Sequence, residues 1–227
     1  MSAPNPLLSD NVPSNILSLL DRLHEESLNQ ESIITRADYA APVIHSNMKD
    51  KFIALEQDKC HFMYQIIKSI GGKNIVEAGT SYGVSTIYLA LAVAANIKAT
   101  GGAGIVIGTE HEVEKAAKAK EYWAECGDVV SGVIDLRVGD LRETLKEALP
   151  DTIDLLLLDI WTPMALPTLK LVQPNFRAGS VVIADNTIAS AAEYKELLDY
   201  IRAPGSGFTS LTLPYNKGLE MCVYSPQ

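Results

Sequence analysis

The sequence predicts an α/β fold in which helices cover both faces of a mostly parallel sheet. Short apolar segments recur from residue 73 onward, and segments with helical periodicity alternate with them. This alternation is typical of βαβ units, whose strands are buried on both faces. The last two apolar segments, 211–214 and 219–224, flank a short polar turn, which predicts an antiparallel pair at the C-terminal edge.

The composition indicates one globular unit and narrows its partners. The chain has 227 residues, of which 47% are hydrophobic and 21% are charged, so wholesale disorder is excluded. A net charge of −9 argues against nucleic acids and anionic membranes as partners, but it is compatible with a small ligand. The 3 cysteines, Cys60, Cys126 and Cys222, are too widely spaced for a disulfide framework or a zinc motif. We expect them to be small core residues in a reducing compartment.

Residues 1–48 form an N-terminal arm that is longer than the core fold needs. Ser14 can cap a helix with a stripe of apolar residues, and His24 is expected on the exposed, charged face of that helix. The stripe favours a homodimer in which the arm packs on the partner; the alternative is that the arm folds onto its own chain.

The segment Met1–Asp10 has neither a basic signal region nor an Arg-rich pattern. No apolar run reaches the roughly 18 residues of a membrane span. The sequence therefore favours a cytoplasmic protein without membrane contact, and import into an organelle stays open.

Residues 49–227 are expected to form the main domain. It begins with a helix over 49–70 that ends at Gly71-Gly72. The expected strands are 73–77, 105–110, 134–138, 153–159, 180–185, 211–214 and 219–224, and the helices between them are 83–97, 112–126, 141–149 and 167–175.

Acidic residues end four of these strands, at Glu77, Glu110, Asp159 and Asp185. In an open parallel sheet, ligands bind beyond the carboxyl ends of the strands. One such acid is as often a helix cap as a ligand contact. Four at the same structural position predict a common crevice.

The turn after the first strand reads Glu77-x-Gly79-x-x-x-Gly83. Gly79 allows a tight turn and a close ligand, and Gly83 lets the next helix start near the strand. The pattern is not the GxGxxG of dinucleotide-binding folds, and the carboxylate would repel a phosphate. The turn suits a ligand that carries an ammonium group.

Two acids further along suit a nucleoside. Glu110 is placed to accept both hydroxyls of a ribose. Asp140 can meet an adenine amino group or cap the helix that starts near Leu141, and both roles can hold together. His111 follows Glu110 and is a candidate for the adenosine edge, although it is more often a residue without a site role.

Three oxygen-bearing side chains, Asp159, Asp185 and Asn186, lie at the ends of neighbouring strands. Such a set suits a hard divalent cation with open positions for water and substrate. No cysteine or histidine accompanies them, which argues against zinc.

Five motifs together resemble the cation-dependent small-molecule O-methyltransferases, in particular catechol O-methyltransferase and the caffeoyl-CoA type. The matching segments are Glu77–Gly83, Glu110, Leu158–Trp161, Ala184–Asn186 and Lys217–Glu220, in order and at compatible spacing. The resemblance implies a Rossmann-like class I methyltransferase fold and S-adenosylmethionine as cofactor. It also implies magnesium as the cation and methyl transfer to one hydroxyl of a catechol or flavonoid, and a fungal-type member is the nearest in pattern.

The resemblance also assigns roles by position. The methionine part of the cofactor would be surrounded by Leu55, Glu77, Gly79, Tyr82, Gly83 and Ser85. Glu110 would hold the ribose, and Asp140 and Trp161 would flank the adenine. Asp159, Asp185 and Asn186 would bind magnesium. Glu220 would hydrogen-bond one acceptor hydroxyl, and Leu219 would line the pocket.

The chain departs from the family where the general base is expected, because Thr162 replaces a lysine and Pro163 follows it. A threonine hydroxyl cannot act as a base near neutral pH, so the cation alone is expected to acidify the acceptor. Two other functions remain: a non-catalytic nucleoside-binding protein of the same fold, and a nicotinamide oxidoreductase. The absence of GxGxxG argues against the latter, and the dehydrogenase-like pair Tyr64 and Lys68 is treated as chance.

Overall fold

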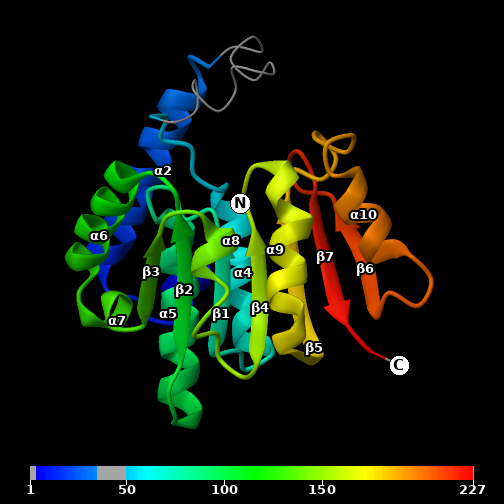
Figure 1. Cartoon of the computed structure of the whole chain (residues 1–227). Coiled ribbons are helices and arrows are strands. Elements are labelled where there is room, and N and C mark those ends of the chain that lie inside the picture. The colour runs from blue at the N-terminus through cyan, green and yellow to red at the C-terminus, as the bar shows by residue number, and fades with distance from the viewer. Residues whose placement is uncertain (1–3, 35–49, 227) are drawn as a thin grey trace.

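The computed structural model describes residues 4–34 and 50–226. Its centre is a seven-stranded sheet in the order β3-β2-β1-β4-β5-β7-β6 (Figure 1). The strands β1 to β5 pair in parallel, and β7 runs antiparallel between β5 and β6, as the sequence predicts. Their bounds are β1 Asn74–Ala78, β2 Ile105–Glu110, β3 Ile134–Val138, β4 Ile153–Leu158, β5 Phe176–Asp185, β6 Phe208–Leu213 and β7 Leu219–Tyr224.

The strand order places a crevice between β1 and β4. From β1 the chain moves outward to β2 and β3 and then crosses back to β4 on the other side of β1. Such a switch in direction leaves the carboxyl ends of the two central strands open to a ligand. The turns after β1 and β4 therefore hold the position where the sequence predicts the site.

Helices pack on both faces of the sheet in two separate apolar clusters. One face carries α1 (Pro6–Ser9), α2 (Ser14–Glu31), α4 (Gln57–Ser69), α5 (Val84–Thr100), α6 (Val113–Cys126) and α7 (Asp128–Ser131). The other carries α8 (Leu141–Thr144), α9 (Ala165–Val172) and α10 (Lys195–Arg202), with the short 3-10 turns η1 (Thr162–Met164) and η2 (Gln173–Asn175) beside α9.

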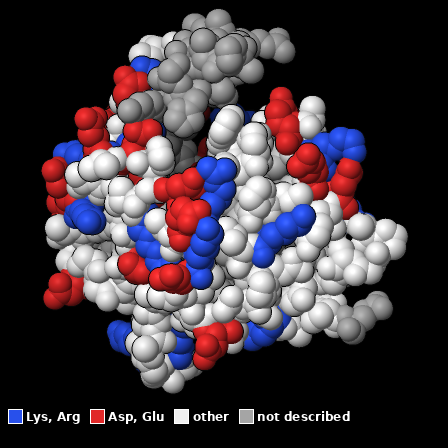
Figure 2. Space-filling view, in the orientation of Figure 1, with Lys and Arg blue, Asp and Glu red and all other residues white. Residues whose placement is uncertain are grey.

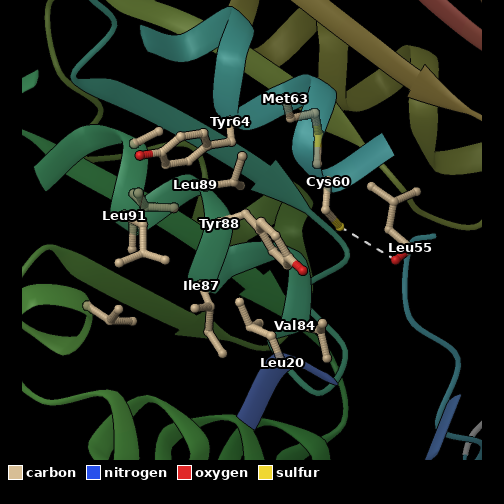
Figure 3. Close-up of a cluster of buried hydrophobic side chains, with 14 of the residues drawn as sticks. Leu20, Leu55, Cys60, Met63, Tyr64, Val84, Ile87, Tyr88, Leu89 and Leu91 are labelled. Atoms are coloured by element: carbon tan, nitrogen blue, oxygen red, sulfur yellow. Dashed lines mark hydrogen bonds between the residues drawn. The ribbon is translucent and has the colours of Figure 1, made fainter. Parts of the chain in front are cut away.

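Helix α5 is the centre of the first cluster. It is apolar around most of its circumference, which is typical of a helix buried on all sides. Figure 3 shows Tyr88 and Leu89 of α5 beside Met63 and Tyr64 of α4. The Cys60 thiol of α4 donates to the Leu55 carbonyl oxygen at 3.5 Å, which ties the segment before α4 to the helix. All three cysteines are buried free thiols, as expected.

The apolar stripe of α2 is buried within its own chain. Ile16, Leu20 and Leu23 are at most 1% exposed and belong to the same cluster as α5. His24 is also buried, and its Nε2 lies 3.0 Å from the Tyr88 hydroxyl, so the prediction of an exposed histidine is wrong. The stripe therefore no longer argues for a partner chain.

Hydrogen bonds from α4 to Asp10 hold the segment after α1 against α4. Asp10, just after α1, accepts hydrogen bonds from the Tyr64 hydroxyl and the Lys68 ammonium. The Tyr64 and Lys68 pair thus has a structural role, unrelated to dehydrogenase chemistry.

Two helices are shorter than the sequence predicts. The segment 50–56 is not helical, and α4 begins at Gln57 after Glu56, whose ψ of 143° is extended. Residue 49 lies outside the described residues. Helix α8 ends at Thr144 because the Arg137 guanidinium binds the carbonyl oxygens of Thr144, Glu147 and Ala148, which competes with helix continuation.

No helix in the described part of the chain is long and apolar enough to cross a membrane. On the face shown in Figure 2, acidic and basic side chains are interspersed, with both signs over α8. There Arg142 pairs with Asp140 and Lys146 with Glu143, so the acidic excess is not gathered into one patch on this face.

Candidate functional site

A hollow lies at the carboxyl ends of β1 and β4, at the predicted crevice. Five of its lining residues are predicted site residues: Leu55, Gly79, Tyr82, Ser85 and Asp159. They come from the segment before α4, the β1–α5 turn and the end of β4. The fold therefore brings together residues that are up to about a hundred positions apart in the sequence.

Gly79 is required where the β1–α5 turn meets the end of β4. Its φ is +94°, and a Cβ there would lie 2.0 Å from the Asp159 carbonyl oxygen. The Asp159 amide in turn donates to the Ala78 carbonyl oxygen at 3.1 Å. The two loops are thus in direct backbone contact, and any side chain at Gly79 would separate them.

Gly83 fixes the start of α5 against α6. It caps the helix with a φ of +77°, and a Cβ would lie 2.5 Å from Nε1 of Trp123. That indole nitrogen donates to the Gly83 carbonyl oxygen at 2.9 Å. Gly83 therefore acts by packing rather than by lining the hollow.

Glu77 is not among the residues that line the hollow, and its contact with the cofactor stays a prediction. Its side chain is fully buried and accepts hydrogen bonds from the hydroxyls of Ser85 (2.6 Å), Thr86 (2.5 Å) and Thr80 (2.8 Å). Burial raises the pKa of Glu77 despite these donors. In this structure Glu77 holds the β1–α5 turn in place through these hydroxyls. Ser85 both donates to the Glu77 carboxylate and lines the hollow.

Glu110 lies beside the same turn. Its carboxylate accepts from the backbone N–H of Ser81 and from that of Glu112, both at 2.7 Å. Ser81 adopts a φ of +49°, so the carboxylate holds a left-handed residue that lines the hollow. A carboxylate has about four acceptor positions, so capacity for ribose hydroxyls remains.

Asp140 is the N-cap of α8, as its alternative role predicts. Its Oδ1 accepts from the Arg142 amide at 2.9 Å, and the Arg142 guanidinium binds both carboxylate oxygens. This contact lowers the pKa of Asp140 to about 2. His111 and Trp161 are exposed nearby in the strand-end loops, and contact of these three residues with adenine stays a prediction.

One of the predicted metal ligands, Asp185, is in contact with a buried lysine. The Lys59 ammonium of α4 lies 2.5 Å from Asp185 Oδ1 and 2.8 Å from Glu56 Oε2. The Lys59 side chain is fully buried. Only the placement of α4 over the strand ends reveals this contact, because Lys59 and Asp185 are 126 positions apart.

The charged groups of this cluster shift one another's pKa values. Burial raises the pKa of Asp159, and the nearby Asp185 and Glu77 carboxylates raise it further. Burial also raises the pKa of Asp185 to about 6, although Lys59 opposes this shift. Burial alone would lower the pKa of Lys59, but Asp185 and Glu56 outweigh it and keep the ammonium charged. The cluster has more carboxylates than cations.

Asn186 has the geometry of a residue kept for a ligand. It adopts a φ of +60°, and its buried Oδ1 has no hydrogen-bond partner within residues 4–34 and 50–226. Both features cost free energy, and such costs concentrate at functional sites. Among the described residues, however, no group of three or more His, Cys, Asp or Glu side chains could hold a metal ion, and the predicted set has two carboxylates and an amide.

Glu220 forms an ion pair with Arg202 of α10, and its contact with the acceptor hydroxyl stays a prediction. Its carboxylate accepts from the Arg202 guanidinium of α10 at 2.8 Å and from the Thr212 hydroxyl. Side chains alternate along a strand, so the neighbouring Leu219 points into the α5 cluster instead. The structure leaves Glu220 as a buried ion-pair residue.

Thr162, the replacement for the family base, opens η1 directly after Trp161. Its side chain is only partly buried, and the next residue is Pro163. Neither Thr162 nor Pro163 therefore supplies a basic side chain to the site.

Comparisons with known proteins agree with this geometry. Residues 76–187 match the family model described as a methyltransferase domain. A search of the curated proteins finds no match.

Three solved structures illustrate the likeness in fold. An O-methyltransferase of Bacillus cereus in complex with S-adenosylhomocysteine is 18% identical, with a TM-score of 0.68 over 97% of this chain and 96% of that chain. An O-methyltransferase of Streptomyces achromogenes in complex with S-adenosylmethionine is 19% identical, with a TM-score of 0.66 over 91% and 98%. A methyltransferase of Podospora anserina bound to S-adenosylhomocysteine is 15% identical, with a TM-score of 0.67 over 99% and 98%. The predicted Rossmann-like methyltransferase fold is thereby confirmed.

Proposed function

We propose that this chain, a methyltransferase by its domain and fold, transfers the methyl group of S-adenosylmethionine to a hydroxyl of a small aromatic diol. The observation that carries the proposal is the hollow between β1 and β4, where the glycine turn, Leu55 and Asp159 meet. The cofactors named for two similar structures, S-adenosylmethionine and S-adenosylhomocysteine, support the choice of donor.

The chain's own residues suggest how the donor is held. The backbone of the β1–α5 turn is exposed to the hollow because Gly79 has no side chain. Tyr82 stacks on Phe52, with ring centroids 4.5 Å apart, and closes one wall. Glu110 beside the turn would accept the ribose hydroxyls. The buried Glu77 carboxylate would favour the ammonium of the methionine part through its charge, without direct contact.

For a divalent cation, the proposed ligands are Asp159, Asp185 and Asn186. The unpartnered Asn186 Oδ1 and the excess of carboxylates fit such an ion, and oxygen ligands suit magnesium. When bound, the ion would polarise an acceptor hydroxyl and lower its pKa. An aromatic acceptor is supported by the exposed side chains of Trp161 and Ile188, which follow the two strands that carry the ligands.

Because no basic side chain replaces the family lysine at Thr162, we expect an acceptor whose hydroxyl is itself acidic. Lys59 is ion-paired and buried, and Thr162 cannot take a proton at neutral pH. The acceptor's own acidity should then limit the rate, so catechols with more acidic hydroxyls, or pyrogallol-type flavonoids, should react best. Losing a positioned base typically costs roughly 10²–10⁴-fold.

The test is transfer of labelled methyl from S-adenosylmethionine to catechols of graded acidity, with magnesium and with a chelator. We expect product only from diols, a rate that rises with pH along each acceptor's ionisation, and a reversible loss in chelator. A rate plateau at one pH for every acceptor would indicate a protein base instead. Thr162→Lys should raise the rate most on weakly acidic catechols. Tight cofactor binding without any transfer would favour the nucleoside-binding alternative.

A further inference from the structure

We propose that Lys59 is a built-in cation of the predicted ion site: it lets the site fold without a divalent ion and weakens the binding of one. The use of the site in methyl transfer rests on the function proposed above. The binding property itself is independent of catalysis and is tested separately.

The Lys59 ammonium lies directly against one of the predicted ion ligands. Lys59 Nζ lies 2.5 Å from one oxygen of Asp185 and 2.8 Å from Glu56, and the Lys59 side chain is fully buried. Its contacts are therefore with carboxylates rather than bulk water. One of the two Asp185 oxygens is already engaged by a positive charge before any ion arrives.

The surroundings of Lys59 are rich in carboxylates. The Asp185, Glu77 and Glu56 carboxylates each raise the pKa of the buried Asp159 carboxyl. Buried carboxylates without a counter-charge strongly destabilise a fold. At the outer edge, Asn216 donates to Glu56 at 3.2 Å, and Lys217 lies 3.8 Å from it. Within residues 4–34 and 50–226, Lys59 is the cation in contact with Asp185, so it stabilises these carboxylates when no divalent ion is bound.

Charge repulsion sets the direction of the effect of Lys59 on ion binding. An ammonium bound to Asp185 lies within a few ångströms of any ion that Asp185 coordinates, and a single and a double positive charge repel strongly at that distance. Lys59 also orients Asp185, which favours binding. The repulsion is the larger effect, because a divalent ion orients carboxylates by its own charge.

The experiment measures Mn²⁺ binding by electron paramagnetic resonance and thermal unfolding with and without Mn²⁺, in the absence of cofactor and acceptor. Lys59→Met should unfold at a lower temperature than the wild type without the ion. It should bind Mn²⁺ at least roughly tenfold more tightly and regain much of the lost stability when the ion is added. Lys59→Arg keeps the charge and should bind Mn²⁺ as weakly as the wild type.

The control variant is Lys68→Met, on the same helix but paired with Asp10, and its Mn²⁺ affinity should not change. Adding Asp185→Asn to Lys59→Met should remove the gain; a gain that persists would place the ion elsewhere and overturn the proposal. Equal or weaker Mn²⁺ binding by Lys59→Met would also overturn it. If Lys59→Met does not fold under either condition, the wild type decides, since a dissociation constant tighter than about 10 µM contradicts a resident competing cation. None of these readouts requires methyl transfer.

Discussion

At the scale of single residues, the site depends on positions where no side chain fits. Gly79 combines a left-handed backbone with a backbone contact to Asp159. Gly71 shares the first property, with a φ of +62°, but a Cβ there would meet nothing within 4 Å. Comparing substitutions at Gly79 and Gly71 therefore separates the cost of backbone strain from the cost of steric collision.

We predict that Gly79→Ala lowers the free energy of unfolding by roughly 2–5 kcal/mol, because strain and collision add. Gly71→Ala should cost only about 1 kcal/mol. Urea unfolding of both variants measures the difference. Equal losses would mean that the β4 loop moves aside at no cost, and the backbone contact would then be unimportant.

Glu110→Ala should weaken S-adenosylmethionine binding roughly ten- to hundred-fold, because the ribose loses a charged acceptor worth about 1.5–3 kcal/mol. The same substitution frees the Ser81 amide, which Glu110 holds at 2.7 Å. Calorimetric titration measures the change, and Glu114→Ala, an exposed acid of α6, is the control. An unchanged dissociation constant would remove Glu110 from the site.

The sequence predicted where the hollow lies better than it predicted what each of the candidate site residues does. Acids at strand ends correctly marked the crevice, because the carboxyl ends of parallel strands share one edge. The ligand contacts of Glu77 and Glu220 stay predictions. In this structure each carboxylate accepts hydrogen bonds from other segments, which the sequence does not show: hydroxyls of α5 and its preceding turn, and Arg202 of α10. The contact of Lys59 with Asp185 likewise depends on helix placement, which no local pattern encodes.

At the scale of elements, strands β1 to β4 and β7 followed the sequence to within one residue. Strands β5 and β6 begin earlier than predicted, at Phe176 and Phe208, and the ends of α4 and α8 also differ. Buried parallel strands are continuous apolar runs, so their positions are visible in the sequence. The end of α8 is set by Arg137, which takes the carbonyl oxygens that a longer helix would use. The start of α4 is set by the non-helical segment 50–56, in which Glu56 is extended and Leu55 lines the hollow.

The contact between α2 and α5 should make stability depend on pH. Burial lowers the pKa of His24 from 6.5 to about 4, and the neighbouring His61 adds to the effect. The unfolded chain takes up a proton near pH 6.5, whereas the folded chain resists until about pH 4. The folded state is therefore progressively destabilised as the pH falls through this window, by up to about 3 kcal/mol.

His24→Gln should flatten this dependence, because glutamine can still bond to Tyr88 but does not titrate. Urea unfolding at several pH values between 4 and 7 measures the slope. His111→Gln, at an exposed position, should keep the wild-type slope. Identical slopes for His24→Gln and the wild type would assign the dependence to other groups.

At the scale of the whole molecule, the homodimer stays a prediction without its original support. The α2 stripe is buried in its own chain, but an outer face formed by Leu28, near the end of α2, and Ile33, just after it, is exposed (65% and 74%). We therefore predict that a homodimer, if it forms, uses this outer face as its interface. Sedimentation at micromolar concentration should give twice 24.6 kDa, and Leu28→Glu should shift it to 24.6 kDa. A wild-type mass of 24.6 kDa would contradict the homodimer.

The antiparallel insertion of β7 between β5 and β6 sets the order in which the molecule can be completed during synthesis. Asp185 stands at the end of β5, and the neighbour of β5 on that side is β7, whose residues 219–224 are translated last among the strands. Until they emerge, β5 is an open edge that offers unpaired backbone groups to other nascent chains. Ribosome-stalled or C-terminally clipped chains should therefore be aggregation-prone, although they contain every proposed ligand of the cofactor and the ion.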